Sequence, residues 1–310
     1  MDLEAAIADY ERCGYRLDMI MPADNPRVAV VSRGTEMLRL TASATGVQAE
    51  PFTGLGHPVI PPSTQEFIIT RASDPAAWNT GRAGMQYRDL ISSRLGGRYI
   101  ASHIRVPEGG PVNDYVHHHR VRFQMIFVRK GWVHVVYEDQ GPPFVMHEGD
   151  FVLQPPGIRH RVLEASKGLE VIEIGSPAEH ETLRDHDLAL PTPARNPYRN
   201  FSGQRFVRHI AATANWNEAD GYKYRDTGIA AATNNLAGVR VLRVANAGER
   251  THTGDFLFLH VLQGSAQLTS RNLGIHALGV DDCCVLPTGA EFALTGSTNC
   301  EILEVALPAP

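Results

Sequence analysis

The sequence predicts a mostly β protein with two similar β domains in tandem, preceded by a small α/β segment. Three observations carry this prediction. Many short runs rich in Val, Ile, Leu and Phe are separated by turn residues drawn from 28 glycines and 20 prolines, a texture typical of strands and turns. A pattern of segments recurs in two later parts of the chain, and the first residues follow a helical periodicity.

Composition excludes several classes of protein. A chain of 310 residues is long enough for two domains, and 43% hydrophobic with 20% charged residues is a globular balance. The net charge is −5 with no block of Lys and Arg, so we expect no nucleic-acid partner. No apolar run reaches the roughly 18 residues of a membrane span, and the first residues lack a secretory-signal pattern. The four cysteines show no CxxC spacing, which favours a reducing, cytoplasmic location.

The first 84 residues are expected to form the α/β segment. Residues 2–12 place their apolar side chains on one helical face with Asp2 as a possible N-cap, which predicts a short amphipathic helix. Apolar runs at 15–21, 27–31 and 37–41 follow between turn residues and predict strands. Residues 50–84 are rich in Pro, Gly and Thr, and we expect them to wrap over the next domain.

An internal repeat defines the rest of the chain. Each copy runs from a Tyr-Arg-Asp triplet through a strand, a Gly- and His-containing stretch and an apolar strand to a closing glycine. The copies span Tyr87 to Gly131 and Tyr224 to Gly264, and a second related segment follows each, at 149–160 and 281–292. A repeat of this kind indicates two copies of one architecture. The predicted boundaries are 1–84 for the α/β segment, 85–185 for the first β domain, 186–202 for a Pro-containing linker and 203–310 for the second β domain.

Two motifs in the first β domain carry the chemistry. Residues 109–131 read GGPVNDYVHHHRVRFQMIFVRKG, and residues 149–160 read GDFVLQPPGIRH. Together they resemble the cupin family, whose pattern is Gly, His-x-His, a fourth ligand position and Gly, followed by Gly-x5-Pro-x-Gly-x2-His. The resemblance implies tandem jelly-roll barrels, or double-stranded β-helices, with a metal at the centre. The arrangement is similar to that of bicupin dioxygenases such as the gentisate and quercetin enzymes.

Strand geometry agrees with the ligands that the resemblance implies. Side chains at i and i+2 share a face of a strand, so His117 and His119 can both face a barrel interior while His118 points the other way. The Pro-Gly turn of the second motif delivers His160 from another segment. Three imidazoles suit Fe, Mn, Ni, Cu or Zn. We expect one divalent ion per chain in the first barrel, with iron as the favoured metal.

The sequence departs from the usual pattern at the fourth ligand position, where Gln124 replaces the common Glu. A neutral ligand set leaves the full +2 charge on the ion and favours an anionic, bidentate substrate. A catecholate, an enolised β-dicarbonyl or a 2-hydroxy or 2-oxo acid each offers two oxygens. Gln124 either ligates the ion or hydrogen-bonds to substrate or metal-bound water, and the sequence leaves both roles open.

Other side chains are candidates for lining the pocket. His103 and Arg105 share a face of the predicted strand at 99–106, and Tyr115 has the parity of the ligand histidines. A salt bridge at the barrel rim is the alternative role for Arg105. We also expect at most one of Arg122 and Arg159 to hold a substrate carboxylate.

The second copy has lost most of these ligands. Aligning the closing glycines puts Arg250, His252 and Leu257 at the first three ligand positions and Phe292 at the last. One imidazole cannot hold a catalytic divalent ion well. We therefore interpret residues 203–310 as a degenerate, metal-free barrel that supports the first barrel and contributes to a dimer interface.

The leading hypothesis is a mononuclear metal-dependent dioxygenase that uses O2 to cleave a C–C bond of a small anionic substrate. The three histidines would hold Fe(II), or another divalent metal, with positions left for substrate and O2. The alternative is a non-oxidative isomerase, lyase or decarboxylase in which the metal is a Lewis acid and Glu164, His103 or Tyr115 is the base. A small-ligand-binding cupin without turnover is the third hypothesis. We expect no membrane partner and a homodimer or larger homo-oligomer.

Overall fold

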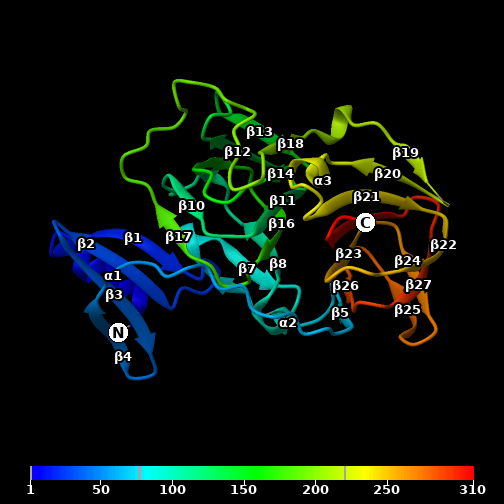
Figure 1. Ribbon diagram of the computed structural model, residues 1–310, viewed down its shortest axis with the longest axis horizontal. Coiled ribbons are helices and arrows are strands. Elements are labelled where there is room, and N and C mark those ends of the chain that lie inside the picture. The colour runs from blue at the N-terminus through cyan, green and yellow to red at the C-terminus, as the bar shows by residue number, and fades with distance from the viewer. Residues whose placement is uncertain (1, 76–77, 220) are drawn as a thin grey trace.

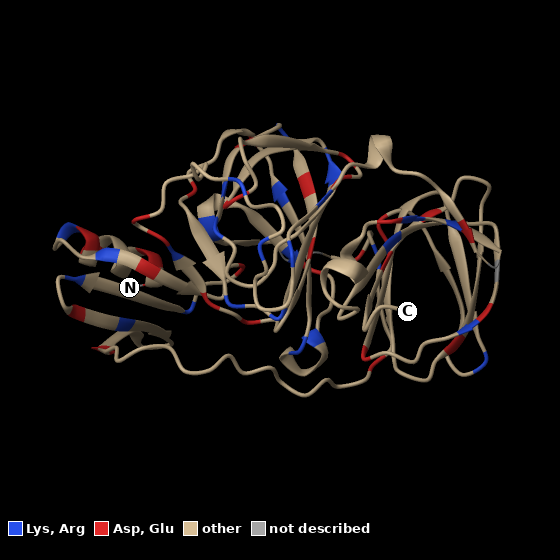
Figure 2. Ribbon diagram, turned by 45° about the horizontal axis from the view of Figure 1, so that its top comes forward, with Lys and Arg blue, Asp and Glu red and all other residues tan. Residues whose placement is uncertain are grey.

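The computed structural model describes residues 2–75, 78–219 and 221–310. An N-terminal unit, a first barrel and a second barrel follow one another along the longest axis of the molecule (Figure 1). Nearly all regular structure is antiparallel strand, so the mostly β prediction is confirmed. No helix of the described residues is long and apolar enough to cross a membrane. Charged residues of both signs lie interspersed on all three parts (Figure 2).

The N-terminal unit is a helix on a small antiparallel sheet, as predicted. The Asp2 side chain accepts a hydrogen bond from the Ala5 amide at 2.8 Å and caps the helix. Leu3 and Ala6 are buried against the sheet, in which β4 lies at the end farthest from the first barrel. The elements are α1 (Leu3–Arg12), β1 (Arg16–Met21), β2 (Val28–Arg33), β3 (Glu36–Ser43) and β4 (Gly46–Pro51).

Two sheets form the first barrel. One has the order β13-β12-β15-β10-β17 and continues through β17 into β1 of the N-terminal unit, with β9 paired to β15. Its strands are β9 (Gly110–Pro111), β10 (His117–His119), β12 (Trp132–Tyr137), β13 (Phe144–His147), β15 (His160–Ala165) and β17 (Thr182–Arg184). The other has the order β18-β14-β11-β16-β8-β7-β6. Its strands are β6 (Asn79–Thr80), β7 (Gln86–Asp89), β8 (Ile100–Val106), β11 (Phe123–Lys130), β14 (Phe151–Leu153), β16 (Leu169–Ser176) and β18 (Val207–His209).

The second barrel repeats this plan. Its larger sheet has the order β19-β20-β21-β28-β23-β26-β5 and its smaller sheet the order β22-β27-β24-β25. The larger sheet contains β5 (Ile68–Thr70), β19 (Asn217–Ala219), β20 (Tyr222–Asp226), β21 (Gly238–Val244), β23 (Phe256–Gln263), β26 (Cys283–Leu286) and β28 (Glu301–Leu307). The smaller sheet contains β22 (Asn246–Thr251), β24 (Ala266–Ser270), β25 (Gly274–Leu278) and β27 (Glu291–Gly296). Short helical turns complete the fold at η1 (Arg82–Gly84), α2 (Arg94–Gly97), η2 (Ala211–Thr213) and α3 (Ile229–Ala232).

Two strands cross between the parts of the chain. β5, from the Pro- and Gly-rich segment, pairs with β26 of the second barrel, and β18, which follows the Pro-containing segment, pairs with β14 of the first. The segment at 50–84 therefore contacts both barrels, because β6 pairs with β7 of the first. The predicted domain boundaries are boundaries in the sequence. In space, single strands cross them and pair with a neighbouring domain.

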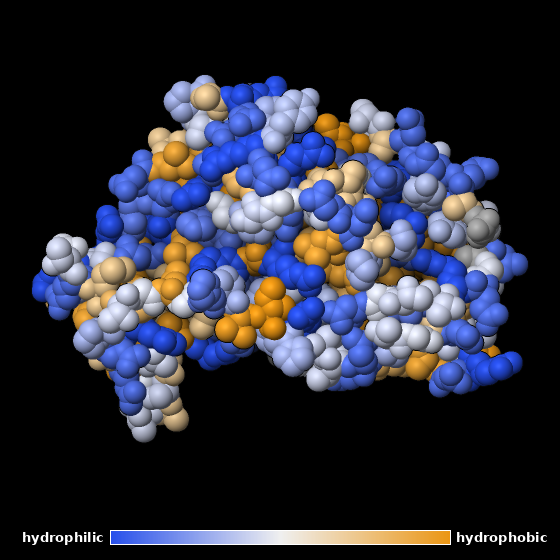
Figure 3. Space-filling model, in the orientation of Figure 1, coloured by the Kyte–Doolittle hydropathy of each residue, from blue (hydrophilic) through white to orange (hydrophobic). Residues whose placement is uncertain are grey.

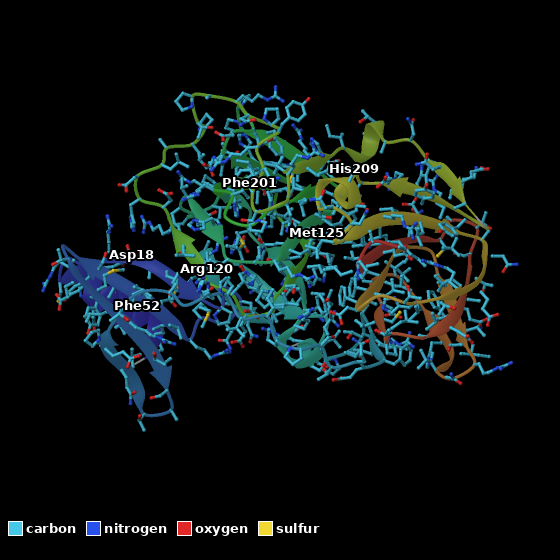
Figure 4. All side chains as sticks on the ribbon, viewed as in Figure 1. Asp18, Phe52, Arg120, Met125, Phe201 and His209 are labelled. Atoms are coloured by element: carbon cyan, nitrogen blue, oxygen red, sulfur yellow. The ribbon has the colours of Figure 1, made fainter. Side chains whose placement is uncertain are left out.

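The barrels share a continuous apolar core. Buried side chains of β11 and β16 join those of β21, β23 and β28 in one cluster. Met125, labelled in Figure 4, lies where the two barrels meet, and the Tyr99 ring stacks on Phe256 with centroids 4.3 Å apart. On the face shown in Figure 3, hydrophobic residues reach the surface in patches between hydrophilic ones. The shared core fixes the first barrel against the second.

Candidate metal centre

Three histidines from two strands come together inside the first barrel. β10 places His117 and His119 on one face, and its antiparallel partner β15 begins at His160, whose register partner is His117. The three side chains are buried, and their candidate ligand nitrogens all lie within 4.8 Å of one another. His118, between them, lies outside this group, as the strand alternation predicts.

Each imidazole is anchored through one nitrogen. Nδ1 of His117 lies 2.7 Å from the Tyr115 carbonyl oxygen, Nδ1 of His119 lies 3.0 Å from Thr182 Oγ1, and Nδ1 of His160 lies 3.1 Å from the Ile158 carbonyl oxygen. The buried Nε2 of His117 has no hydrogen-bond partner among the described residues. Metal-binding histidines are typically oriented in this way by a bond at the other nitrogen. The residues present therefore fit a divalent ion.

Burial keeps these imidazoles neutral. Loss of hydration lowers the pKa of His117 and His119 well below the usual value and lowers the pKa of His160 to about 4. Nearby cationic groups, including Arg82 beside His117, act in the same direction. Because a metal binds the deprotonated imidazole, the folded protein presents its ligands ready for an ion near neutral pH.

A cavity of about 90 Å³ lies beside the histidines, inside the barrel. Most of its wall is apolar, from Val, Ile, Leu and Met side chains of both sheets. The polar lining residues are Arg82, His119, Gln124, Gln154, His160 and Glu173, together with the Tyr87 and Tyr137 rings. Tyr137 Oη accepts a hydrogen bond from Gln154 Nε2 at 2.7 Å. The cavity suits a small ligand with a polar end and an apolar body.

Gln124 lies in the cavity wall, and a carboxylate fixes its amide. Its Nε2 donates a hydrogen bond to Glu173 Oε1 at 2.5 Å, while its buried Oε1 has no partner among the described residues. Burial raises the pKa of Glu173. The His180 ring lies next to His119, with centroids 5.3 Å apart. Glu173 and His180 are two of the polar residues near the centre that the sequence analysis missed.

A signal for Glu173 does exist in the repeat. The segments 169–177 and 300–308 read LEVIEIGSP and CEILEVALP, so the same pattern of two glutamates and a proline closes each copy. Glu173 pairs in register with Ile126, and Glu304 pairs with the matching Leu259. A charged residue retained inside a buried strand of both copies marks an interior site.

The structure places His103 and Arg105 away from the cavity, which corrects the prediction that they line it. Ile104 and Val106 of β8 line it instead, so the opposite parity of the strand faces inward. His103 Nε2 lies 2.9 Å from Glu170 Oε2, and the Arg105 guanidinium lies 3.9 Å from the centroid of the Trp78 ring. The sequence shows which residues share a face, but neighbouring strands decide which face is inside.

Tyr115 also lies outside the cavity lining, although it touches a ligand. Its ring packs edge-on against His117 with centroids 5.8 Å apart, and the Arg184 guanidinium covers it. Its contribution to the centre is the carbonyl oxygen that anchors His117. The side chain is thus placed to support a ligand from behind.

The remaining basic and acidic candidates do not line the cavity. The Arg159 Nε lies 3.1 Å from Asp185 Oδ2, and Glu164 is exposed on β15. The Arg122 side chain is also absent from the cavity lining, while its carbonyl accepts a hydrogen bond from Gln204. Glu164 is therefore not positioned to act as a base in this cavity, which corrects that part of the prediction.

A different basic residue reaches the cavity from the turn between β6 and β7. Arg82 of η1 lines it and forms an ion pair with Asp114, whose side chain is fully buried. Asp114 also accepts hydrogen bonds from the amides of Tyr115 at 2.8 Å and Val162 at 2.9 Å. Its Oδ1 lies 3.5 Å from Nδ1 of His117. Arg82, which precedes the predicted start of the first β domain at residue 85, thus takes part in building its centre.

The second barrel carries an ion cluster at the equivalent position. Arg250 pairs in register with Phe292, as His117 pairs with His160, so the predicted alignment of the copies is confirmed by strand register. Arg250 Nη2 lies 2.6 Å from Glu304 Oε2, and Arg240 forms an ion pair with the other carboxylate oxygen. In the described part of the chain, the histidines of the first barrel are the sole cluster of this metal-binding type. In the second copy an ion cluster beside an apolar core thus stands where the first copy has its histidines.

Comparison with known proteins agrees with this architecture. Residues 102–175 match the cupin domain family. A structure of oxalate decarboxylase from Bacillus subtilis at pH 4.6 superposes with a TM-score of 0.57 at 13% identity, covering 80% of this chain and 76% of that one. A structure of the same enzyme from work on its Mn(II) centres also gives a TM-score of 0.57, at 12% identity over 80% of this chain and 78% of that one. No curated protein matches the sequence.

The family match covers β8 to β16, the region that contains all three histidines and both sequence motifs. The structural similarity extends over both barrels and shows the fold. Residues 102–175 therefore match the cupin domain family and hold a buried three-histidine centre, within a chain whose two-barrel fold is similar to that of the oxalate decarboxylase.

Proposed function

We propose that this protein is a mononuclear metal-dependent dioxygenase that cleaves a C–C bond of a small anionic substrate carrying two chelating oxygens. The observation that carries the proposal is the centre of three neutral imidazoles, with no carboxylate in the described ligand cluster. An ion held by neutral ligands keeps its full charge and favours an anionic chelate. When bound, the metal supplies a site at which substrate and O2 meet.

The residues of the chain have separate roles in this proposal. His117, His119 and His160 hold the ion, which we propose to be iron, with Mn, Ni, Cu and Zn as the alternatives. Gln124 presents its unpartnered Oε1 from the cavity wall, either as a fourth ligand or as a hydrogen-bond acceptor for the substrate. The apolar wall receives the body of the substrate and limits access of water. We also propose a homo-oligomeric, cytoplasmic protein.

A second candidate is a non-oxidative lyase, isomerase or decarboxylase, and Glu173 favours it. This carboxyl lines the same cavity as the histidines and its pKa is raised by burial. A carboxyl of this kind can exchange a proton with a substrate whose enolate is stabilised by a Lewis acid. The residues named earlier for this role lie outside the cavity, so Glu173 takes their place.

Metal analysis together with oxygen uptake tests the proposal. The protein, expressed without a His tag, is compared with His119→Ala for metal content, then reconstituted anaerobically with Fe(II). An oxygen electrode follows a screen of enolisable dicarbonyls, short 2-oxo and 2-hydroxy acids, and catecholates. About one metal per chain, lost in His119→Ala, with substrate-dependent oxygen uptake, supports the dioxygenase. Stoichiometric metal with substrate turnover but no oxygen uptake favours the second candidate, and protein without metal affinity overturns both.

A further inference from the structure

We propose that Arg82, at the turn between β6 and β7 of the first barrel, is the residue that recognises the substrate's carboxylate, and that the substrate is a short-chain acid. This inference rests on the proposed function, because the acid is the substrate of the three-histidine centre. The inference adds to that function the residue that recognises the substrate. It also uses the size of the cavity to choose among the three proposed substrate classes. Four features of the structure support it.

The first feature is a buried cation with a free donor. The Arg82 side chain is only 10% exposed, lines the cavity and pairs with Asp114 through Nη1. Its Nε is buried and has no hydrogen-bond partner among the described residues. An unpaired donor of a buried guanidinium is costly, and a ligand oxygen in the cavity would satisfy it. A planar guanidinium can donate two parallel hydrogen bonds to a carboxylate, which the point charge of a lysine ammonium cannot do.

The second feature is a backbone built to hold Arg82 at this place. The Arg82 amide donates to the Ala23 carbonyl at 3.0 Å. A Cβ at Gly81 would lie 2.5 Å from that same oxygen and 2.8 Å from Tyr87 Cε2, so only glycine fits. Ala83 adopts a positive φ of 55° in the same turn. Such a conformation persists only where its surroundings enforce it, and it is typical of functional sites.

The third feature is that Asp114 connects the cation to the metal ligands. Its carboxylate accepts from two backbone amides as well as from Arg82, and it lies 3.5 Å from Nδ1 of His117. Arg82 is therefore linked through Asp114 to the anchored side of His117, and it lines the same cavity as His119 and His160. A substrate bound in this cavity can contact both the guanidinium and these two histidines.

The fourth feature is size. A protein cavity of about 150 Å³ holds benzene, or about 25 Å³ for each non-hydrogen atom. At that ratio, the cavity of about 90 Å³ holds about four non-hydrogen atoms. The smallest 2-oxo and 2-hydroxy acids have about five non-hydrogen atoms, two of which are the chelating oxygens at the ion, so they come nearest to this space. A catecholate ring exceeds it, because the ring alone has the size of benzene.

Ligand binding measured by NMR titration tests the role of Arg82 without turnover. The probes are propionate, its neutral isostere propionamide and the longer hexanoate, added to metal-free and to zinc-loaded protein. The variant Arg82→Lys keeps the charge next to Asp114 but removes the guanidinium fork. Arg105→Lys is the matched control, because Arg105 lies on the other face of β8. If Arg82→Lys fails to fold, Arg82→Met combined with Asp114→Asn removes both charges together.

We expect the metal-free protein and Arg105→Lys to bind propionate at least about tenfold more tightly than propionamide, and Arg82→Lys to lose most of this preference. Hexanoate should bind more weakly than propionate. A preference that appears only with zinc and survives in Arg82→Lys assigns recognition to the metal, and overturns this inference while the proposed function stands. Loss of the preference in Arg82→Lys, in a protein that consumes no oxygen, retains Arg82 and overturns the dioxygenase.

Discussion

Glu304→Gln should strongly destabilise the second barrel. The Glu304 carboxylate is 1% exposed and carries an ion pair to Arg240 on one oxygen and to Arg250, at 2.6 Å, on the other. The substitution leaves two guanidinium groups facing a neutral amide in the barrel interior. Removing one partner of a buried ion pair lowers the free energy of unfolding by about 3 to 5 kcal/mol. The two arginine side chains are 18% and 21% exposed, and partial hydration places the loss near the lower end, about 3 kcal/mol.

Equilibrium urea unfolding measures this loss, and a double variant separates charge from packing. Adding Arg250→Met to Glu304→Gln removes one of the two stranded charges and should recover part of the stability. Glu218→Gln is the control, because Glu218 and its partner Lys223 are exposed and their pair should contribute nothing measurable. The metal content of the first barrel should stay the same in all three variants.

Either of two results would refute this reasoning. A loss below about 1 kcal/mol in Glu304→Gln would mean that the ion cluster is solvated in solution. A loss of metal from the first barrel in Glu304→Gln would mean that the second barrel shapes the metal centre as well as its own interior.

Three further predictions concern the first barrel. His117→Ala should lose both bound metal and turnover, measured by elemental analysis and activity assay; retention of either would argue against the assigned ligands. The metal-free protein should become less stable as the pH falls from 6.5 towards 4, because unfolded histidines take up protons there while His160, with a folded pKa of about 4, does not. At pH 5 His160 alone accounts for about 2 kcal/mol, and His160→Gln should flatten the pH slope of urea unfolding; an unchanged slope would contradict this. Gly81→Ala should cost about 1 to 3 kcal/mol in urea unfolding and weaken propionate binding, since its Cβ meets backbone at 2.5 Å; an effect no larger than that of Gly56→Ala, whose Cβ meets nothing within 4 Å, would refute it.

Local sequence patterns predicted much of this protein. The alternation in HHH decided that His117 and His119 share a face, and the spacing of the second motif identified His160. The internal repeat predicted two similar barrels, and the alignment of its copies put Arg250 and Phe292 at the positions of His117 and His160, which agrees with the strand register of both copies. These features depend on neighbours in sequence and on strand periodicity, which a single chain displays directly.

Only the tertiary structure decided what fills the space around the ligands. Parity could not choose between His103 and Ile104 for the inner face of β8, because that choice depends on which side the other sheet covers. Arg82 reaches the centre from a segment with no periodic signal, through a turn that packs against Ala23. Glu173 acquires its importance from a hydrogen bond to Gln124 across two strands. The sequence by itself determined the three candidate ligand histidines and the repeat, whereas long-range packing determined the charge, size and walls of the cavity, because those depend on residues far apart in the chain.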